Sequence, residues 1–263
     1  MGRVVDKWES AEPYHGFMGR WSGLVAQPFV DWLGPALGQR WLDVGCGSGA
    51  LSEVVIREQN PARLVAIDAS QDFVDSAKGR LGILAECRVG DAMALSLDAD
   101  EVDLAVSGLV LNFVPEPGQV IAEMKRVTAP GGTVGVYVWD YAGQMDFLRT
   151  FWDVVVELDP SAAELHEGQR FPDCHADALH RLFVSAGLHD VDTASIDIET
   201  LFEDFEDYWR PFLGGQGPAG AYVRAMGDPE RAALRTTLEK RLPWSADGSI
   251  AMQARAWAVK GRA

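Results

Sequence analysis

A turn with three alternate glycines is the feature that most constrains the fold of this chain. The apolar run Trp41–Val44 leads into Gly45, Gly47 and Gly49, and a helix-like stretch follows. Glycine has no Cβ, so the backbone can turn sharply there or lie close to a ligand. A strand that enters such a turn and leaves as a helix presents free backbone N–H groups at one edge of a parallel sheet. The stretch therefore predicts a pocket for a nucleotide-like ligand.

The sequence after this turn alternates between strand-like and helix-like runs. Helical spacing of apolar residues follows the glycine turn, resumes after Ser70, a candidate helix cap, and returns after Pro117. Such alternation predicts crossover connections and a parallel sheet. The predicted strands cover residues 41–44, 63–68, 86–89, 102–106 and 133–139. Residues 40–140 are therefore expected to form a doubly wound α/β core.

The segments outside this core are less regular. Residues 1–22 are rich in aromatic and small side chains, and the helical pattern of this lead-in segment continues through Leu33 until Gly34 and Pro35 end it. Two insertions interrupt the later part of the sheet, at 141–175 (helical over 143–158, loop-like over 159–175) and at 203–243 (mostly helical). Between and after them, strands are expected at 191–198 and 249–259. We expect a single domain over 1–263, in which 1–38 and both insertions form a lid over the carboxyl edge.

Charge and cysteine content exclude several classes of partner. The formal net charge of −16 disfavours nucleic acid and anionic membranes. Cys46, Cys87 and Cys174 are widely spaced and form no CxxC pair, so neither a disulfide framework nor a metal site is expected. No apolar stretch reaches about 18 residues, and the first residues lack the apolar run of a signal peptide. We therefore expect a cytoplasmic protein.

Acidic residues follow three neighbouring strands. Asp43 closes the first strand, Asp68 the second, and Asp91 follows the third. Tips of adjacent parallel strands lie about 4.8 Å apart, so Asp68 is expected to face the glycine turn and accept hydrogen bonds from ribose hydroxyls. Asp91 is a candidate acceptor for the amine of a base. The alternatives are an acidic helix lead-in for Asp68 and a turn aspartate for Asp91.

Two nucleotide-like ligands fit this pattern. The run Gly45–Ala50 satisfies the relaxed dinucleotide pattern, so an NAD(P)-dependent oxidoreductase is one reading. A pyrophosphate is anionic, however, and Asp43 at the mouth of its loop is electrostatically unfavourable. A sulfonium-bearing amino acid instead carries an ammonium and a positive sulfur, which suit a carboxylate. Asp43 therefore favours the sulfonium ligand.

These residues resemble the motifs of a known family. The run Leu42–Gly49 is similar to motif I of the class I S-adenosylmethionine-dependent methyltransferases. Asp68 matches their acidic residue after the second strand, and three later motifs follow in order at Gly90–Ala92, Asp103–Ser107 and Pro130–Thr133. The resemblance covers residues 40–140, and Ala254–Val259 resembles the closing strand. It implies a Rossmann-like, doubly wound, mostly parallel seven-stranded sheet with an antiparallel last strand and helical lid insertions.

The resemblance also implies roles for individual residues. The glycines would approach the methionine moiety, Asp43 its ammonium, Asp68 the ribose and Asp91 the adenine. Cys46 is expected to be a packed thiol rather than a nucleophile. Tyr14 and Arg20 of the lead-in segment are further candidates near the donor and acceptor. The full set of expected cofactor-binding residues is Asp43, Gly45, Cys46, Gly47, Gly49, Asp68, Ala69, Asp91, Ala92, Met93, Ser107, Tyr14 and Arg20.

The acceptor side carries fewer signals. Methyl transfer needs a general base only when the acceptor is protonated, so no catalytic residue is predicted. Leu111-Asn112-Phe113 stands where small-molecule members commonly have a histidine. Other candidates near the acceptor are Trp139, Asp140, Tyr141, Trp152 and Trp209, with core packing as the alternative for the aromatics. Candidate bases are His15, His166 and His175, with a surface position as the alternative.

The expected function is transfer of a methyl group from S-adenosylmethionine to a small-molecule acceptor, with S-adenosylhomocysteine as product. An O- or N-nucleophile is favoured as acceptor, and the protein is expected to be a monomer or a homodimer. The aromatic content of the insertions suggests an apolar or aromatic acceptor. Two alternatives remain, an NAD(P)-dependent oxidoreductase and a non-catalytic binding or regulatory protein on the same fold.

Overall fold

The computed structural model describes residues 19–214 and 217–263. Tyr14 and His15 lie outside them. The chain forms two compact units. The sheet unit comprises Trp21–Trp139, Asp173–Ile196 and Ala256–Ala263. Of the described residues, the helical unit comprises Gly19, Arg20, Asp140–Pro172 and Asp197–Arg255. None of the described helices is both long and apolar enough to cross a membrane.

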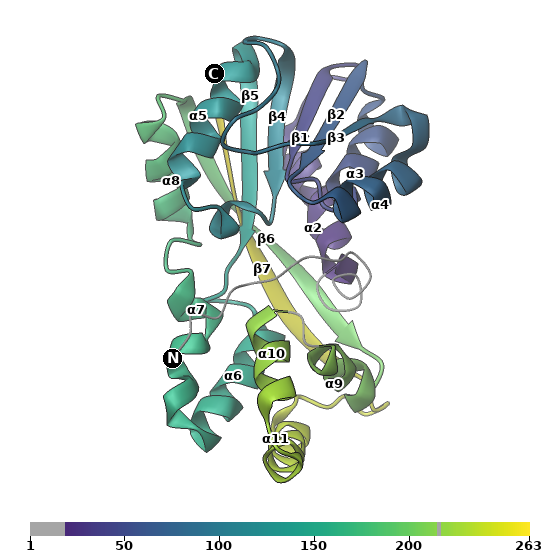
Figure 1. The fold of residues 1–263 in the computed structure, drawn as a ribbon, viewed down its shortest axis with the longest axis vertical. Helices are drawn as coiled ribbons and strands as arrows, with labels where there is room; N and C mark the ends of the chain where they lie inside the picture. The colour runs from purple at the N-terminus through teal and green to yellow at the C-terminus, as the bar shows by residue number, and fades with distance from the viewer. Residues whose placement is uncertain (1–18, 215–216) are drawn as a thin grey trace. The chain divides into compact units, whose positions relative to one another are not determined.

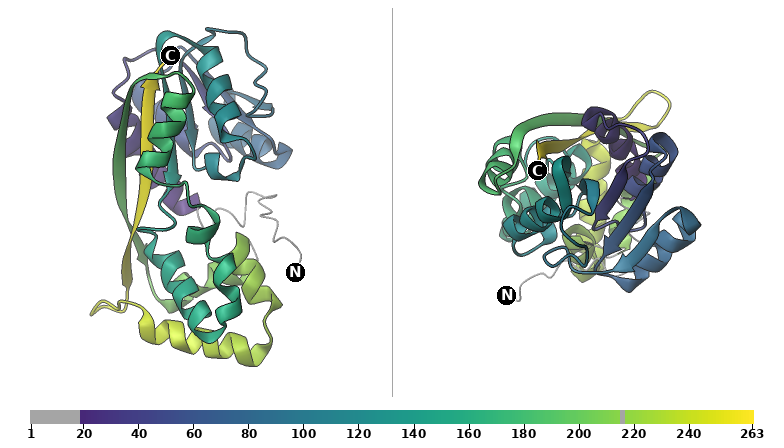
Figure 2. Two further views of the ribbon diagram at one scale, coloured as in Figure 1. Left: turned by 90° about the vertical axis from the view of Figure 1, so that its left-hand side faces the viewer. Right: turned by 90° about the horizontal axis from the view of Figure 1, so that it is seen from above.

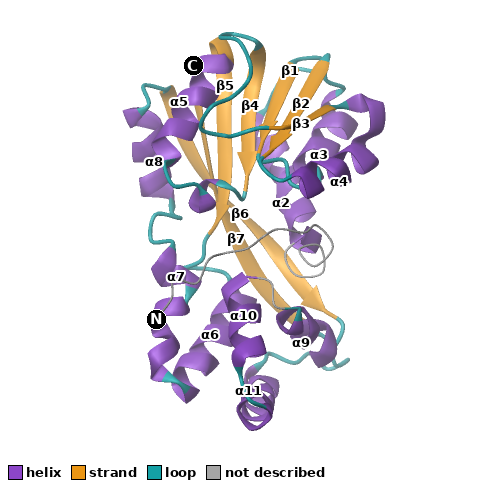
Figure 3. Ribbon diagram, viewed as in Figure 1, coloured by secondary structure: helices purple, strands orange, loops and turns teal. Residues whose placement is uncertain are grey.

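The strands form a seven-stranded sheet with the order β3-β2-β1-β4-β5-β7-β6 (Figures 1 and 3). Parallel pairing joins β1 to β2 and β4, β2 to β3, and β4 to β5. β7 runs antiparallel to β5. This order confirms the predicted mostly parallel sheet with an antiparallel last strand. The strands are β1 (Arg40–Val44), β2 (Arg63–Asp68), β3 (Glu86–Val89), β4 (Val102–Gly108), β5 (Thr128–Trp139), β6 (His189–Phe202) and β7 (Ile250–Arg262).

Helices pack on both faces of the sheet unit. In β5, side chains at alternate positions point to opposite faces; Tyr137 contacts Phe29 of α2, with ring centroids 4.7 Å apart. α5 packs on β4 and β5 and also contacts α8, and the two helices lie side by side in Figures 1 and 2. The helices of this unit are α2 (Arg20–Leu33), α3 (Ala50–Gln59), α4 (Gln71–Leu81), α5 (Pro117–Val127) and α8 (Ala176–Ser185), with short 3-10 turns η2 (Gly82–Leu84) and η3 (Leu111–Phe113).

The predicted helices and strands are present in the structure, although β6 and β7 run on to Phe202 and Arg262, beyond the predicted ends at 198 and 259. Two larger differences have a structural reason, and β5 is the first. It begins at Thr128 rather than at the predicted Thr133. Thr128 pairs with Val102 while Thr133 pairs with Leu104, so the intervening residues bulge out of the ladder. Gly131 donates to the Ala263 carbonyl at 3.0 Å, and Gly132 accepts from the Ala263 amide at 3.1 Å. Gly131 and Gly132 therefore form a bulge in β5 that is stabilised by Ala263, the residue after β7.

The second difference is in the first insertion. The prediction of a loop over 159–175 is wrong, because η4 (Pro160–Leu165) and α7 (Glu167–Arg170) lie there. The Asp159 carboxylate caps η4 by accepting from the Ser161 amide at 3.1 Å. The His166 ring caps α7 by accepting from the Gly168 amide at 3.0 Å. These local side chain–backbone bonds compensate for the lack of a long apolar repeat.

An aromatic core holds the helical unit together. The rings of Phe151 and Phe212 stack with centroids 4.4 Å apart and an interplanar angle of 7°. The Tyr208 hydroxyl, fully buried, donates to the Phe147 carbonyl at 2.9 Å. Trp152 and Trp209 are buried in the same core. The helices of this unit are α6 (Asp146–Leu158), α7, α9 (Phe205–Leu213), α10 (Gly217–Ala225) and α11 (Asp228–Arg241).

The close approach of α2 to β5 gives a stability prediction. A Cβ added to Gly135 would lie 2.8 Å from Leu33 Cδ2 and 3.1 Å from Phe29 Cζ. We expect Gly135→Ala to lower the free energy of unfolding by about 1–3 kcal/mol, because overpacking displaces the helix. Urea denaturation followed by circular dichroism measures the change.

Gly23→Ala is the matched control for this prediction. Gly23 lies inside α2, and a Cβ there would meet nothing within 4 Å. Alanine is better than glycine in a helix interior by about 1 kcal/mol, so this variant is expected to be at least as stable as the wild type. Equal stability of the two variants would contradict tight packing of α2 on β5.

Candidate functional site

The glycine turn lies between β1 and α3, as predicted. Gly45, Gly47 and Gly49 have φ values of 71°, 53° and 89°, which side-chain-bearing residues rarely adopt. A Cβ at Gly45 would also lie 2.5 Å from Val110 Cγ2, whereas one at Gly47 would meet nothing within 4 Å. Gly45 is therefore required by packing as well as by backbone conformation. Gly47 has open space beside it, where a ligand can approach the backbone.

Asp68 ties the end of β2 to this turn. Its Oδ2 accepts from the Gly47 amide at 2.9 Å, and its Oδ1 accepts from the Ser70 amide at 2.9 Å. The Ile67 carbonyl next to it accepts from the amides of Gly45 and Cys46, at 2.7 and 2.9 Å. The expectation that Asp68 faces the glycine turn is therefore confirmed. Ser70 stands at the N-cap of α4, but its side chain makes no capping bond.

Asp43 is a buried carboxylate at the end of β1. Only 1% of the residue is exposed, and its Oδ2 accepts from the Ser52 hydroxyl of α3 at 2.7 Å. No donor among the described residues reaches its buried Oδ1. Burial raises the pKa of Asp43 to about 7, and the Asp68 charge adds to the rise while the Ser52 hydrogen bond opposes it. A buried oxygen without a partner is costly, so this site favours a hydrogen-bond donor, especially a cationic one.

Asp91 closes the row of strand tips at β3. It is exposed, and its Oδ1 accepts from the Met93 amide at 2.8 Å in a tight turn. The preceding Gly90 amide donates to the Asp68 carbonyl at 3.0 Å, which holds this turn against the end of β2. Ala92 and Met93 are half-buried beside it, and Ala69 is exposed after β2. The structure thus brings the expected ribose and adenine residues to adjacent strand ends.

Two other expected site residues are buried and already engaged. The Ser107 hydroxyl at the end of β4 donates to the Val44 carbonyl at 2.7 Å. Ser107 therefore joins β4 to β1, and its hydroxyl hydrogen is not free for a ligand. Cys46 packs against Ala66, Ala77 and Leu81. Burial raises the pKa of its thiol, and the charges of Asp43 and Asp68 add to the rise, which agrees with a packed thiol.

Asn112 of η3 carries polar atoms that the sequence did not single out as a site. Both its amide oxygen and nitrogen are buried, and neither has a partner among the described residues. Leu109, which precedes η3, has a φ of 63°. This left-handed conformation is strained for a residue with a bulky side chain. Val110, between them, packs on Gly45. The resemblance marked Leu111–Phe113 only as the place where small-molecule members commonly have a histidine, and a single sequence shows neither the strain nor the unpartnered amide.

The remaining candidates lie within the helical unit or in the cores. Arg20 pairs with Asp207 of α9 at 2.9 Å, and its guanidinium lies 4.6 Å from the Phe202 ring centroid. Its role at the donor stays a prediction. His175 caps α8 by accepting from the Ala178 amide at 3.4 Å. Ordinary packing accounts for the expected acceptor aromatics, which are almost fully buried: Trp139, Tyr141, Trp152 and Trp209.

Comparison with known proteins supports this reading of the sheet unit. Residues 42–136 match the family model described as a methyltransferase domain. The chain is 30% identical over 155 residues to an uncharacterised protein of Mycobacterium tuberculosis, covering 53% of this chain and 56% of that protein. It is 32% identical over 111 residues to an uncharacterised methyltransferase of the same organism, covering 42% and 44%. The chain thus spans about half the length of these relatives.

Solved structures with this fold are similar over nearly the whole chain. A putative methyltransferase of Haloferax volcanii, in complex with a methyltransferase activator, has a TM-score of 0.61 at 19% identity, covering 100% of this chain and 99% of that one. A phosphoethanolamine N-methyltransferase of Haemonchus contortus, with phosphomonomethylethanolamine and S-adenosylhomocysteine, has a TM-score of 0.56 at 14% identity, covering 90% and 52%. At these identities the likeness concerns the fold.

The family match, the sheet order and the motifs agree on one assignment. The glycine turn, Asp68 and the turn at Asp91 all fall within the matched range. The sheet order with an antiparallel β7 extends the agreement to the end of the chain. Residues 42–136 therefore match the methyltransferase-domain family, and the seven-stranded sheet that contains them has a Rossmann-like methyltransferase fold.

Proposed function

We propose that this protein transfers the methyl group of S-adenosylmethionine to a small-molecule acceptor. The observation that carries the proposal is the buried Asp43 carboxylate, whose Oδ1 has no donor among the described residues. It stands two residues before the first glycine of a turn with open space at Gly47. An ammonium, directly or through one water, would supply the missing donor and favour the ionised carboxylate.

The residues around the glycine turn disfavour binding of a dinucleotide. A pyrophosphate would place negative charge at a turn flanked by Asp43 and Asp68, where Coulomb repulsion is strong because the surroundings are partly buried. The amides that would cradle a phosphate are also engaged, since those of Gly45, Cys46 and Gly47 donate to Ile67 and Asp68. An NAD(P)-dependent oxidoreductase is therefore the weaker reading of this turn.

In this proposal, Asp68 binds the ribose hydroxyls. Each of its oxygens accepts one backbone amide in the structure. A carboxylate oxygen has a second lone pair, so the side chain can accept ribose hydroxyls while it keeps the turn in place. Asp91, exposed after β3, would accept from the adenine amine, and the half-buried Met93 would pack on the base.

The reaction needs positioning more than acid–base chemistry. The donor supplies an electrophilic methyl carbon on a positively charged sulfur, which leaves as a neutral thioether. Holding the two reactants in line can supply much of the rate acceleration. A neutral amine or an ionised oxygen acceptor requires no protein base, and an O- or N-nucleophile is favoured. We further propose that the insertions at 141–175 and 203–243 supply acceptor contacts, and that the charge of −16 keeps nucleic acids away.

Native mass spectrometry of the purified protein tests the donor class. We expect co-purified S-adenosylhomocysteine or S-adenosylmethionine, released on denaturation and identified by its mass. Saturable binding of NAD(P)H with no binding of S-adenosylhomocysteine would contradict the proposal and favour the oxidoreductase. Binding of the donor with no methylated product across an acceptor screen would favour a non-catalytic protein.

The ribose role of Asp68 gives the second prediction. We expect Asp68→Ala to weaken S-adenosylhomocysteine binding at least tenfold by calorimetry, because both acceptors for ribose hydroxyls are lost and the Gly47 amide loses its partner. Asp68→Asn keeps one acceptor oxygen and is expected to weaken binding less. Asp72→Ala removes an exposed carboxylate from the first turn of α4 and is the matched control. Unchanged affinity in Asp68→Ala would remove this residue from the ribose role.

The raised pKa of Asp43 gives a third prediction, on stability. A folded pKa of about 7 lies above the ordinary value of 3.8, so the folded chain binds more protons between these values than the unfolded one. Stability from this group is therefore present at low pH and is lost as pH rises toward 7. From pH 5 to 8 we expect the ligand-free wild type to lose about 2–3 kcal/mol of unfolding free energy relative to Asp43→Asn. Urea denaturation at both pH values measures it, and parallel curves would contradict the raised pKa.

A fourth prediction couples this titration to the ligand. At pH 7, Asp43 is partly protonated in the free protein, and an ammonium bound near it would lower its pKa. Binding of S-adenosylhomocysteine should therefore release up to about half a proton. Calorimetry in phosphate and Tris buffers, which differ in ionisation enthalpy, measures the release. In Asp43→Asn the observed enthalpy should no longer depend on the buffer; a persisting dependence would assign the proton to another group.

A further inference from the structure

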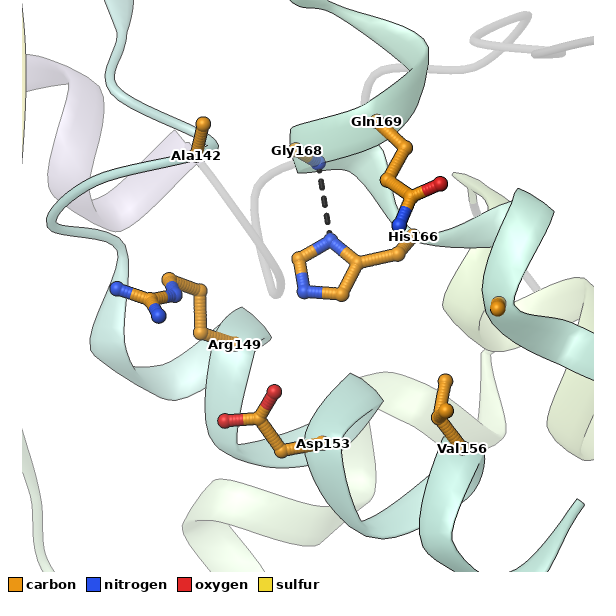
Figure 4. Close-up of a pocket in the computed structure, with 8 residues that line it drawn as sticks. Ala142, Arg149, Asp153, Val156, His166, Gly168 and Gln169 are labelled. Atoms are coloured by element: carbon orange, nitrogen blue, oxygen red, sulfur yellow. Dashed lines mark hydrogen bonds between the residues drawn. The ribbon is translucent and has the colours of Figure 1, made fainter. Parts of the chain in front are cut away.

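A cavity of about 410 Å³ lies within the helical unit and shares no lining residue with the glycine turn. Its volume is in the range of small-molecule pockets. Three of its residues, Arg149, Asp153 and Val156, share one face of α6, because they follow the helical spacing of four and three residues. Two others, His166 and Gln169, come from the N-cap and body of α7 (Figure 4).

His166 presents a hydrogen-bond donor to this cavity. Its Nδ1 accepts from the Gly168 amide at 3.0 Å, so the proton of the neutral ring is on Nε2. Figure 4 shows this second nitrogen on the side of the cavity where Arg149 and Asp153 lie. Burial lowers the pKa of His166, and Arg149 acts in the same direction while Asp153 opposes it. In the neutral ring Nδ1 is engaged by the Gly168 amide and Nε2–H is the free donor; a role as general base stays a prediction.

The position of the His166 ring is fixed by its neighbours. The ring lies against Trp152, with centroids 6.3 Å apart and an interplanar angle of 29°. A Cβ at Gly168 would lie 3.0 Å from both Ala142 Cα and the Tyr141 carbonyl oxygen, so α7 packs tightly on the chain before α6. The donor is thus held in place before any ligand binds.

Charges of both signs line the same cavity. Arg149 is anchored by a hydrogen bond from its Nη1 to the Gly143 carbonyl. The carboxylate of Asp153 makes no hydrogen bond or ion pair within the described part of the chain, and it points into the cavity in Figure 4. Val156 and Ala163 add aliphatic surface. The lining therefore offers a guanidinium, a neutral donor, a carboxylate and an apolar wall.

We propose that this cavity binds a small zwitterion with an aliphatic side chain, such as a free α-amino acid. Its carboxylate is bound by Arg149 and by the Nε2–H of His166, and its ammonium by Asp153. The apolar group packs against Val156 and Ala163. The cavity lies in the insertion proposed to supply acceptor contacts, but none of its lining residues belongs to the donor site, so binding there can be tested without methyl transfer.

Charge complementarity selects a zwitterion over simpler ligands. A ligand with only a carboxylate pairs with Arg149 but is repelled by Asp153. A ligand with only an ammonium pairs with Asp153 but is repelled by Arg149. A ligand with both charges satisfies both groups, so discrimination arises from the unpaired charge that each simpler ligand leaves. One turn of α6 separates Arg149 from Asp153, which brings the two charged heads within reach of a single small molecule.

The fifth prediction uses three matched probes: L-leucine, 4-methylpentanoate, which lacks its ammonium, and 3-methylbutylamine, which lacks its carboxylate. Calorimetry or saturation-transfer NMR on the full chain measures their dissociation constants. We expect L-leucine to bind at least tenfold more tightly than either analogue. Asp153→Asn should weaken L-leucine binding at least fivefold without weakening 4-methylpentanoate, and Arg149→Gln should weaken both carboxylates.

Two controls keep this test independent of folding and of the donor site. Glu164→Gln removes an exposed carboxylate from η4 without touching the lining and should leave L-leucine binding unchanged. Asp68→Ala should also leave it unchanged, whatever it does to S-adenosylhomocysteine. Circular dichroism confirms that each variant is folded. Absence of saturable L-leucine binding to the wild type, or equal binding of all three probes, would overturn the proposal.

Discussion

The two hydrogen bonds of the Asp68 carboxylate are the interaction on which the glycine turn at the carboxyl edge of the sheet depends. One bond holds the Gly47 amide of the turn after β1, and the other holds the Ser70 amide at the start of α4. Glycines alone leave a turn conformationally free, and this freedom has an entropic cost on ordering. A single side chain at the neighbouring strand tip removes that freedom while leaving lone pairs for a ligand. Asp68 therefore fixes the conformation of the turn without a ligand and is also the proposed acceptor for the ribose hydroxyls.

Asp43 lies at the same edge of the sheet, but its hydrogen-bonding capacity is not satisfied. Asp68 is satisfied by backbone amides, whereas Asp43 is buried with one oxygen lacking a donor among the described residues. The two carboxylates therefore have different roles, although both carry negative charge when ionised. One is stable without a ligand, and the other is costly until a donor arrives. A binding site with this arrangement favours a ligand that carries positive charge, and it couples that ligand to a proton.

Much of the sheet unit could be predicted from the sequence, because its elements depend on local spacing. The glycine turn, the strand ending at Asp68 and the helix that follows Ser70 can be predicted from apolar periodicity and terminal residues. The features that the sequence did not predict depend on contacts with residues far away in the chain. The bulge at Gly131 and Gly132 depends on Ala263, and the burial of Asp43 depends on Ser52 and the surrounding sheet. The cavity at His166 also depends on distant residues, because its lining comes from α6, η4 and α7, whose packing the sequence does not show.

The antiparallel pairing of β5 with β7 has a consequence for synthesis of the chain. β5 meets its partner only near the end of the sequence, since Trp139 pairs with Ala256 and Thr133 with Arg262. Until those residues leave the ribosome, β5 is an apolar edge strand with an open row of backbone donors and acceptors, a known template for wrong pairing. All residues of the helical unit from Asp140 onward are made during this interval. The unpaired edge of β5 is therefore open to wrong pairing for as long as this interval lasts.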